Sequence, residues 1–586
     1  MTVDLTLKSL TFSISSLAAY TCLTLTTLAQ SPPPPGITLP PETPETIEQI
    51  LPQPAVSPLP PQPPTPLPQP ELQTPPPQPP PDITSPESDS EALPQSADRI
   101  FIKTIEVLGN TVLHPEIAAL IAPWENREAS FEDLLNLRSE ITQLYLKNGY
   151  ITSGAFLVNN QELSQGEVQI QVVEGELEQI EITGLNRLRE GYIRRRLELA
   201  TTPPLNQKRL ETALQLLQLD PLLQQVNAEL TAGSTPGRNS LQVQIKEAPA
   251  FHAGIATANN QSPSLGTVQN SINASYDNVL GFGDRFSAEY GIAAGLNLYD
   301  LNYTIPINAR NGTLSLRYSN SDSLIIEEPF EALEIRSESR TFSVNFRQPL
   351  IRTPEREFGI GIALDLRRSQ TYILDDIPFS FSEGPDDGES NVTVIRFYQD
   401  WVNRSPGRVL AARSQFSFGI NAFDATINDI STDGQFFSWI GQFQWVEQLS
   451  PRALLVARIN TQLTPDSLLS LERFSIGGVD TVRGYSQNQG VGDNGIVGTV
   501  EVRLPLTSNP RILQLSPFFE IGTVWNNRDA NPEPATIAGL GLGLDWLITS
   551  DLSLRLDYGI PLIKVDDEGD SLQDNGLYFS LRYQPF

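Results

Sequence analysis

The strongest constraint on the fold is an alternation of apolar and polar residues that runs from Phe251 to Phe586. A period of two residues is typical of β-strands, whose successive side chains point to opposite faces. No helical periodicity interrupts the pattern. It is clearest in residues 552–560, where leucine, tyrosine and isoleucine alternate with serine, arginine, aspartate and glycine. It recurs at 342–347, 416–421, 499–504 and 539–546. The sequence therefore predicts a large antiparallel β-structure in this region.

Two architectures fit such a pattern, a transmembrane barrel and a soluble array of β-sandwiches. Aromatic residues fall on the apolar face and charges on the other, as in a barrel with lipid outside and water inside. The hydrophobic content of 39% is too low for a bundle of membrane helices, but a barrel wall meets lipid with only every second residue. Of the 24 basic residues in 251–586, only Lys564 is a lysine, and the arginines would suit an acid–base ladder in the lumen. We interpret the region as a barrel, with long external loops such as the acidic residues 375–389.

The N-terminus favours export, which supports the barrel. Lys8, a following apolar stretch and Thr27-Leu28-Ala29 predict a signal peptide over residues 1–29. The alternative is an uncleaved membrane anchor. Cys22 is the only cysteine, so the mature chain would contain none. One cysteine and two histidines exclude a disulfide scaffold and any zinc site built on several such ligands, and no metal or cofactor is expected.

Residues 30–98 form a segment of unusual composition. The stretch from Ser31 to Pro94 holds 25 of the 49 prolines, and residues 30–98 contain nine acidic residues but no lysine or arginine. Proline fixes the backbone and removes amide donors, so this segment is predicted to be an extended, acidic, disordered linker. A docking site for a proline-binding module is the alternative. The net charge of −30 also argues against nucleic acid as a partner.

Residues 99–175 and 176–249 are predicted to form two small α/β domains with the order β-α-α-β-β. In the first, Ser130 and Asp133 form a capping-box pattern that opens a helix ending at Asn148-Gly149. Neither domain offers a nucleophile beside a base, which favours a binding arm over an enzyme. The expected elements of the first domain are an alternating strand with Phe101, Ile105 and Val107 on one face, a helix around 115–124, the helix between Ser130 and Asn148-Gly149, and strands 151–158 and 168–173. Those of the second are strands 177–183, 226–230 and 241–246 and helices 192–199 and 207–219.

These two domains resemble the polypeptide-transport-associated (POTRA) repeats of two-partner secretion transporters, the hemolysin secretion/activation protein family. The resemblance rests on residues 144–153, Gln161, Gly166, 172–175 and 180–184. It implies two periplasmic domains that bind an unfolded exported polypeptide through exposed strand edges, followed by an outer-membrane barrel of about 16 strands. A mere periplasmic spacer is the alternative for the repeats.

The predicted inward loop at residues 465–495 carries Val482-Arg483-Gly484-Tyr485, preceded by two glycines. This run resembles the signature of the loop that folds into the barrel in the same family. The resemblance implies that the arginine reaches a carboxylate in a Phe-x-Asp-x-Gly motif on the barrel wall. The matching residues here are Phe518, Glu520 and Gly522, with glutamate in place of aspartate. We expect Arg483 and Glu520 to hold the loop in the lumen, the alternative being a surface loop with an ordinary arginine.

The two ends of the barrel region also match the family. Phe586 resembles the terminal aromatic that barrel-assembly machinery recognises, although it is one residue out of phase with Leu577, Phe579, Leu581 and Tyr583. Residues 277–284 are expected to form a hairpin turn with no separate chemistry. The plug helix common in the family is not expected, because only residues 45–51 could form two helical turns.

The sequence thus predicts a non-enzymatic protein transporter of the bacterial outer membrane, since no phosphate loop, dinucleotide fingerprint or catalytic triad pattern is present. The resemblance implies a secreted β-rich exoprotein of the hemolysin or adhesin type as partner, with outer-membrane lipids around the barrel and the barrel-assembly machinery acting during biogenesis. The alternatives are a factor that assembles other barrels and a passive pore with accessory periplasmic domains.

Overall fold

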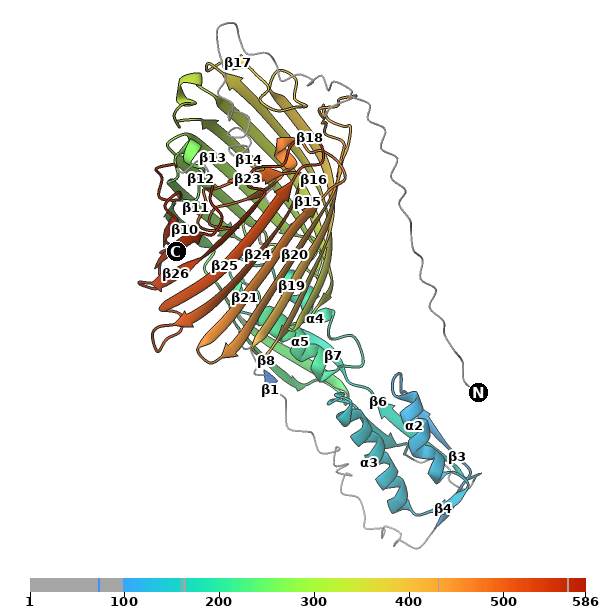
Figure 1. The fold of residues 1–586 in the computed structure, drawn as a ribbon. Helices are drawn as coiled ribbons and strands as arrows, with labels where there is room; N and C mark the ends of the chain where they lie inside the picture. The colour runs from blue at the N-terminus through green and yellow to red at the C-terminus, as the bar shows by residue number, and fades with distance from the viewer. Residues whose placement is uncertain (1–71, 74–98, 160, 162–164, 430–431, 566–568) are drawn as a thin grey trace, which may run out of the picture.

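The computed structural model describes residues 72–73, 99–159, 161, 165–429, 432–565 and 569–586. Two α/β units form an arm that meets one end of a closed β-barrel (Figure 1). The predicted signal peptide, and the predicted linker apart from Leu72–Gln73, lie outside the described residues. Within the described ranges, no helix is both long and apolar enough to cross a membrane.

The first unit packs two helices against a small sheet. The capping box forms as predicted, because the Ser130 hydroxyl accepts from the Asp133 N–H at 3.2 Å and the Asp133 carboxylate accepts from the Ser130 N–H at 2.8 Å. Leu134, Leu137 and Ile141 are buried along the predicted helix face. The elements are β2 (Ile100–Ile102), β3 (Thr104–Leu108), α2 (His114–Ile121), β4 (Arg127–Ala129), α3 (Phe131–Lys147), β5 (Gly154–Leu157) and β6 (Glu167–Val173).

The prediction that Phe101, Ile105 and Val107 share one face of a single strand is wrong. The chain bends at Lys103, whose N–H donates to the Gly166 carbonyl at 2.7 Å, and the strand divides into β2, which pairs with β4, and β3, which pairs with β6. Ile102 is therefore buried and Phe101 is 52% exposed, while Ile105 stays in the core. A bend of one residue reverses which side chains face inward.

The second unit repeats the order of the first and is joined to it by backbone hydrogen bonds. The Gln207 N–H donates to the Gly149 carbonyl at 2.9 Å, and the Leu205 N–H donates to the Gly175 carbonyl at 2.6 Å. Its sheet has the order β8-β9-β7, with β1 (Leu72–Gln73) added in parallel to the free edge of β8. The elements are β7 (Glu176–Thr183), α4 (Glu190–Glu198), α5 (Gln207–Gln218), β8 (Leu223–Ala232) and β9 (Arg238–Glu247).

Sixteen antiparallel strands close into the barrel, which confirms the predicted architecture. The first and last strands meet over four residue pairs, whereas β16 and β18 share fifteen. The two-residue β17 (Ile377–Pro378) adds to β16. The barrel strands are β10 (Phe251–Ala258), β11 (Gln269–Asp277), β12 (Arg285–Ala293), β13 (Leu296–Pro306), β14 (Thr313–Leu324), β15 (Arg336–Arg352), β16 (Arg356–Ile373), β18 (Glu389–Ser405), β19 (Arg408–Gly419), β20 (Phe437–Ser450), β21 (Ala453–Leu463), β24 (Asn494–Pro505), β25 (Leu513–Trp525), β26 (Thr536–Leu547), β27 (Leu552–Pro561) and β28 (Leu577–Tyr583).

The two faces of the wall follow the predicted alternation. On β27, Leu556 and Tyr558 are 43% and 50% exposed on the outer face, whereas Asp557 between them is buried toward the lumen. Arginines and carboxylates link neighbouring strands inside the barrel. Arg347, for example, bonds Glu357 at 2.7 Å and Asp400 at 3.1 Å. Lys564, the lone lysine of this region, lies exposed in the connection after β27.

The connections at the barrel end opposite the arm are long and partly packed. An apolar cluster joins the connections after β10, β12, β14 and β16 and includes residues of the predicted acidic loop. Its buried members are Leu265, Leu296, Ile325, Phe330, Leu333, Ile335, Ile373, Phe379 and Phe381. These connections therefore form a structured rim around the barrel mouth, from which the connection between β21 and β24 turns inward.

Candidate functional site: an inward hairpin fixed to the barrel wall

The connection between β21 and β24, which we call the inward hairpin (residues 464–493), folds against the inner wall. It contains η5 (Ser470–Glu472) and two short paired strands, β22 (Phe474–Ile476) and β23 (Gly490–Gly492). Ile476, Val482 and Tyr485 of the hairpin form one buried cluster with inward-facing wall residues. Those wall residues are Val497, Val524 and Ile537. The structure thus places this connection inside the barrel and not on its surface, within one residue of the predicted start and two of the predicted end.

Arg483 occupies a pocket of carboxylates on the wall. Its Nη2 lies 2.5 Å from Glu520 Oε1, its Nε lies 3.1 Å from the same oxygen, and its backbone N–H donates to Glu520 Oε2 at 2.7 Å. Its Nη1 lies 2.6 Å from Asp557 Oδ1, and its Nη2 lies 3.5 Å from Glu501 Oε2. The guanidinium carbon lies 3.4 Å from the centre of the Phe518 ring. Arg483 is only 3% exposed, so solvent screens these charges little.

The three carboxylates depend on Arg483 to different degrees. Glu501 also bonds Arg503 at 2.7 Å, and both Glu501 and Asp557 bond Arg555. Among the described residues, the hydrogen bonds to the Glu520 side chain come from Arg483 alone. Loss of one partner of such a buried pair typically costs about 3–5 kcal/mol, because the other charge stays buried without compensation. Glu520 is therefore the wall residue most directly tied to the hairpin.

The hairpin main chain lies directly on a patch of wall glycines. Gly484 has φ +105°, and a Cβ there would lie 3.0 Å from the Pro561 nitrogen. On the wall, a Cβ at Gly559 would lie 2.5 Å from the Gly484 nitrogen, and a Cβ at Gly539 would lie 2.1 Å from the Arg483 carbonyl oxygen. Gly522 likewise leaves room for the Val482 side chain, because a Cβ added at Gly522 would lie 3.1 Å from Val482 Cγ2. Side chains at these positions would push the hairpin away from the wall.

Two tyrosines complete the contact. The Tyr578 hydroxyl accepts from the Gly484 N–H at 2.8 Å and donates to the Tyr485 carbonyl at 2.6 Å. The Tyr485 hydroxyl lies 2.8 Å from the carbonyl oxygens of Ala538 and Ile563. The structure therefore brings all seven predicted residues of the two motifs into one buried cluster. They are Val482, Arg483, Gly484, Tyr485, Phe518, Glu520 and Gly522.

Sequence reasoning missed several residues of the cluster. Asp557 and Gly559 fall in the inward phase of β27, and Gly539 falls in that of β26, so the alternation already marks them as lumen-facing. The alternation does not tell which inward residues of different strands lie at the same height, because that depends on the stagger of the whole barrel. Tyr578 is missed for the same reason.

The predicted assembly-signal residue lies elsewhere. Phe586 follows the end of β28, is 69% exposed, and has its ring centre 6.1 Å from that of Phe251 at the start of β10. Leu577, Leu581 and Tyr583 are exposed on the outer face of β28. Phe586 thus stands at the barrel seam, apart from the inward hairpin.

The turn at residues 277–284, expected to have no separate chemistry, is a contact surface for the arm. The Arg189 N–H donates to the Gly281 carbonyl at 3.0 Å, and the Arg189 guanidinium lies 3.9 Å from the Phe282 ring centre. A Cβ at Gly283 would lie 2.3 Å from the Tyr192 ring. The second α/β unit is thereby fitted to the end of the barrel that faces the arm.

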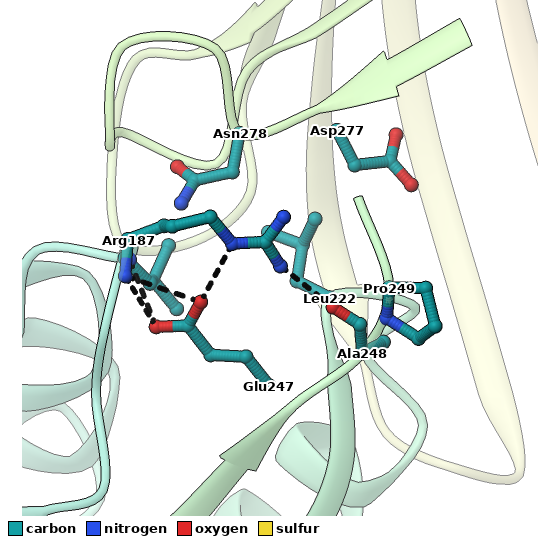
Figure 2. Close-up of a pocket in the computed structure, with 8 residues that line it drawn as sticks. Arg187, Leu222, Glu247, Ala248, Pro249, Asp277 and Asn278 are labelled. Atoms are coloured by element: carbon teal, nitrogen blue, oxygen red, sulfur yellow. Dashed lines mark hydrogen bonds and ion pairs between the residues drawn. The ribbon is translucent and has the colours of Figure 1, made fainter. Parts of the chain in front are cut away.

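A small pocket marks the same joint (Figure 2). The Glu247 carboxylate accepts from the N–H groups of Asn186, Arg187 and Leu188 at 2.7–3.0 Å. Arg187 Nη2 donates to the Ala248 carbonyl at 2.7 Å (Figure 2). Burial acts to raise the pKa of the Glu247 carboxyl, but these donors outweigh burial and hold that pKa below its ordinary value. Glu247 thus ties the loop between β7 and α4 to the end of β9, the strand that leads into the barrel.

Comparison with known proteins decides the family. The family model for the haemolysin secretion/activation protein ShlB/FhaC/HecB matches residues 237–546, more than half of the chain, and the model for the ShlB-type POTRA domain matches residues 100–175. The chain belongs to the ShlB/FhaC/HecB family. Members of this family are outer-membrane transporters of two-partner secretion, with periplasmic POTRA domains and a partner exoprotein. This assignment favours secretion over the alternative of a barrel-assembly factor.

Individual relatives agree with the family match. The outer membrane transporter CdiB of Dickeya dadantii is 22% identical over 76% of this chain and 79% of its own length. The heme/hemopexin transporter protein HuxB of Haemophilus influenzae is 22% identical over 72% of this chain and 75% of its own. The solved structure of CdiB from Escherichia coli matches with a TM-score of 0.66 at 22% identity and covers 85% of this chain and 93% of that one. This structural likeness supports the fold.

Proposed function

We propose that the POTRA arm captures an unfolded, β-rich exoprotein of the hemolysin or adhesin type, and that the barrel passes it outward when the inward hairpin withdraws. The observation that carries the proposal is the burial of Arg483 among three wall carboxylates inside the lumen. Ionic and hydrogen-bonded contacts can break and re-form without covalent change. Such a contact suits a hairpin that holds a resting pore closed and then moves.

The free edge of β8 supports capture by strand addition. This edge is ten residues long, and β1 pairs with it in parallel only at Ala228 and Glu229. An extended segment of the same chain thus already adds to this edge. A strand edge binds through backbone hydrogen bonds and is tolerant of the sequence of its ligand, as an unfolded cargo requires.

Capture can be tested by photo-crosslinking in a transport-arrested complex. A crosslinking residue at the exposed Asn227 on β8 should form an adduct with the exoprotein, whereas one at the exposed Lys208 on α5 should not. Adducts of equal yield at the two positions, or none at either, would contradict capture at this edge.

The hairpin is tested by Arg483→Ala, with Arg528→Ala in an exposed connection as the control. Removal of Arg483 leaves Glu520 buried and uncompensated, so the docked hairpin should lose about 3–5 kcal/mol. We expect altered channel conductance in planar bilayers and strongly reduced export, with wild-type behaviour in the control. Normal export together with unchanged conductance would refute the holding role of Arg483.

We also propose that Phe586 serves as the recognition signal for the barrel-assembly machinery. It lies exposed at the seam where β28 meets β10, beyond the last paired residue of the wall. A terminal aromatic at that place is accessible to a partner before the barrel closes.

A further inference from the structure

A second buried ion cluster lies at the base of the inward hairpin, where η5 follows β21. Its charges are reversed relative to those of the cluster around Arg483. Glu472, at the end of η5, is 3% exposed. Its Oε1 lies 2.9 Å from Arg367 Nη1 and 2.8 Å from Arg396 Nη2, and its Oε2 lies 3.0 Å from the same Arg396 nitrogen. Here the hairpin supplies the anion and the wall supplies the cations, from β16 and β18.

The wall holds Arg396 in place independently of the hairpin. Arg396 Nε bonds Asp365 at 2.6 Å, and its Nη1 donates to the Ser417 hydroxyl at 2.9 Å. The exposed fractions of the Arg367 and Arg396 side chains are 6% and 9%. Arg396 thus has wall partners of its own beside Glu472, whereas Arg367 Nη1 bonds the hairpin at both the Leu471 carbonyl and Glu472.

Apolar packing shields this second cluster from water. Leu468, Leu469 and Leu471 of the hairpin form a buried group with wall and rim residues. Those residues are Val392, Val394 and Phe436. Gln462 also donates to the Glu472 carbonyl at 2.9 Å. Charge pairs in such an environment are weakly screened and hold a defined geometry.

We propose that Glu472 is a positioning residue that anchors the base of the inward hairpin, and that the pore opens only when this anchor and the Arg483 anchor both release. The inference rests on the proposed role of the hairpin in gating. Since the two wall sites carry opposite charge, Arg483 is repelled from the basic site and Glu472 from the acidic one. The pair of anchors therefore fixes both the position and the orientation of the hairpin, as unlike-charge pairing does in other specific contacts.

Two disulfide-trapping pairs can report the two ends of the hairpin separately. Ser470 and Ser382 have their hydroxyl oxygens 3.5 Å apart at the base, so Ser382→Cys with Ser470→Cys reports base docking. Ser486 and Asp574 are hydrogen-bonded near the tip, so Ser486→Cys with Asp574→Cys reports tip docking. Because the only native cysteine is Cys22, in the predicted signal peptide, the background is expected to be free of other thiols.

The test variant is Glu472→Gln, and Asp480→Asn is its matched control, an exposed residue of the same hairpin with the same change of charge. Glu472→Gln should slow base crosslinking roughly tenfold or more, because charge-assisted hydrogen bonds are replaced by weaker ones, and should leave tip crosslinking close to the wild-type rate. Arg483→Ala should give the opposite pattern. The control should change neither rate.

An unchanged base-crosslinking rate in Glu472→Gln would overturn the anchor. If that variant does not reach the outer membrane, Arg396→Lys provides the same test, because lysine keeps the charge but cannot reproduce the fork of bonds to Glu472 and Asp365. Base crosslinking at the wild-type rate in Arg396→Lys would equally overturn it. The Ser382→Cys, Ser470→Cys variant can also be oxidised so that a disulfide locks the base of the hairpin. Undiminished export through this locked channel would instead refute the gating role of the hairpin. Failure of the Glu472 anchor and failure of the gating role therefore give different experimental results.

Discussion

Glu520 does more than pair with a guanidinium. Its carboxylate also accepts the backbone N–H of Arg483, so a single wall side chain fixes both the main chain and the side chain of the hairpin tip. The longer reach of glutamate, compared with the aspartate usual in the resembling motif, is compatible with this double contact. Substituting the hairpin arginine therefore removes only part of what Glu520 holds.

Gly484→Ala should displace the hairpin tip, the part that carries Arg483 and Gly484, from the barrel wall. The added Cβ would meet main-chain atoms of Ile560 and Pro561 at 3.0–3.2 Å, and the backbone has φ +105°. Main chain cannot rotate away as a side chain can, so we expect slower tip crosslinking and altered conductance. Gly498→Ala is the control, because its Cβ would meet only one atom, at 4.0 Å. Wild-type docking in Gly484→Ala would contradict the close approach.

The motif residues could be predicted from the sequence because they are contiguous or nearly so. Val482 to Tyr485 and Phe518 to Gly522 each form a short local pattern. Asp557 and Tyr578, which complete the cluster, lie 74 and 93–94 residues from their hairpin partners. Their inward phase is predictable, but their contact with Arg483 and Gly484 depends on barrel closure. Glu472 was not singled out for the same reason, since its arginines lie 76 and 105 residues away.

Among the elements, alternation predicts the barrel strands well because each strand has lipid on one side and the lumen on the other. The α/β units lack that uniform environment. A bend at Lys103 was enough to reverse the predicted face of Phe101 and Ile102, although the capping box at Ser130 and the helix that follows it are as predicted. Local hydrogen-bond donors such as those around Glu247 decide where these small elements meet.

The tie between the β7–α4 loop and the end of β9, next to the barrel, should depend on pH through Glu247. A lowered folded-state pKa means that the Glu247 carboxylate stabilises this tie fully above the ordinary glutamate pKa of about 4.3. That contribution is lost as the pH falls through the lowered value. Hydrogen exchange of the amides of residues 186–188, corrected for intrinsic rates, should show protection that decreases from about pH 5 to pH 3.

In Glu247→Gln the same amides should be less protected at neutral pH, and their protection should no longer vary across that window. Glu229→Gln on the exposed face of β8 serves as the control. If wild-type protection stayed constant down to pH 3, Glu247 would not hold the β7–α4 loop through its charge.

For the whole molecule, the second unit is fitted to two turns at one end of the barrel. The second unit contacts the turn at residues 278–284 through Arg189 and Tyr192, and Arg196 bonds Asn311 in the next periplasmic turn at 2.9 Å. Two neighbouring turns thus support one face of the arm. The sequence marked residues 277–284 as a turn, but it did not reveal this contact, because the partners come from different domains.

Gly283→Ala should loosen this fit. The Cβ would overlap the Tyr192 ring at 2.3 Å, and Gly283 has φ +80°, which an alanine adopts with strain. Distances between spin labels on α5 and on a periplasmic turn should become broader, whereas Gly191→Ala, within α4 and close to no more than a flexible arginine, should leave them narrow. A distribution as narrow as that of the wild type in Gly283→Ala would show that the turn does not restrain the arm.

The position of Lys564 has a practical consequence for studying the transporter at work. All other lysines of the chain beyond residue 98 lie in the arm, at positions 103, 147, 208 and 246. Amine-directed reagents applied from outside the cell therefore find a single lysine on the barrel, at its outer mouth, while the lysines that the same reagents reach in the periplasm lie in the arm. Chemical acylation can thus report which compartment a bound exoprotein shields, without altering any of the permanently charged guanidinium groups inside the pore.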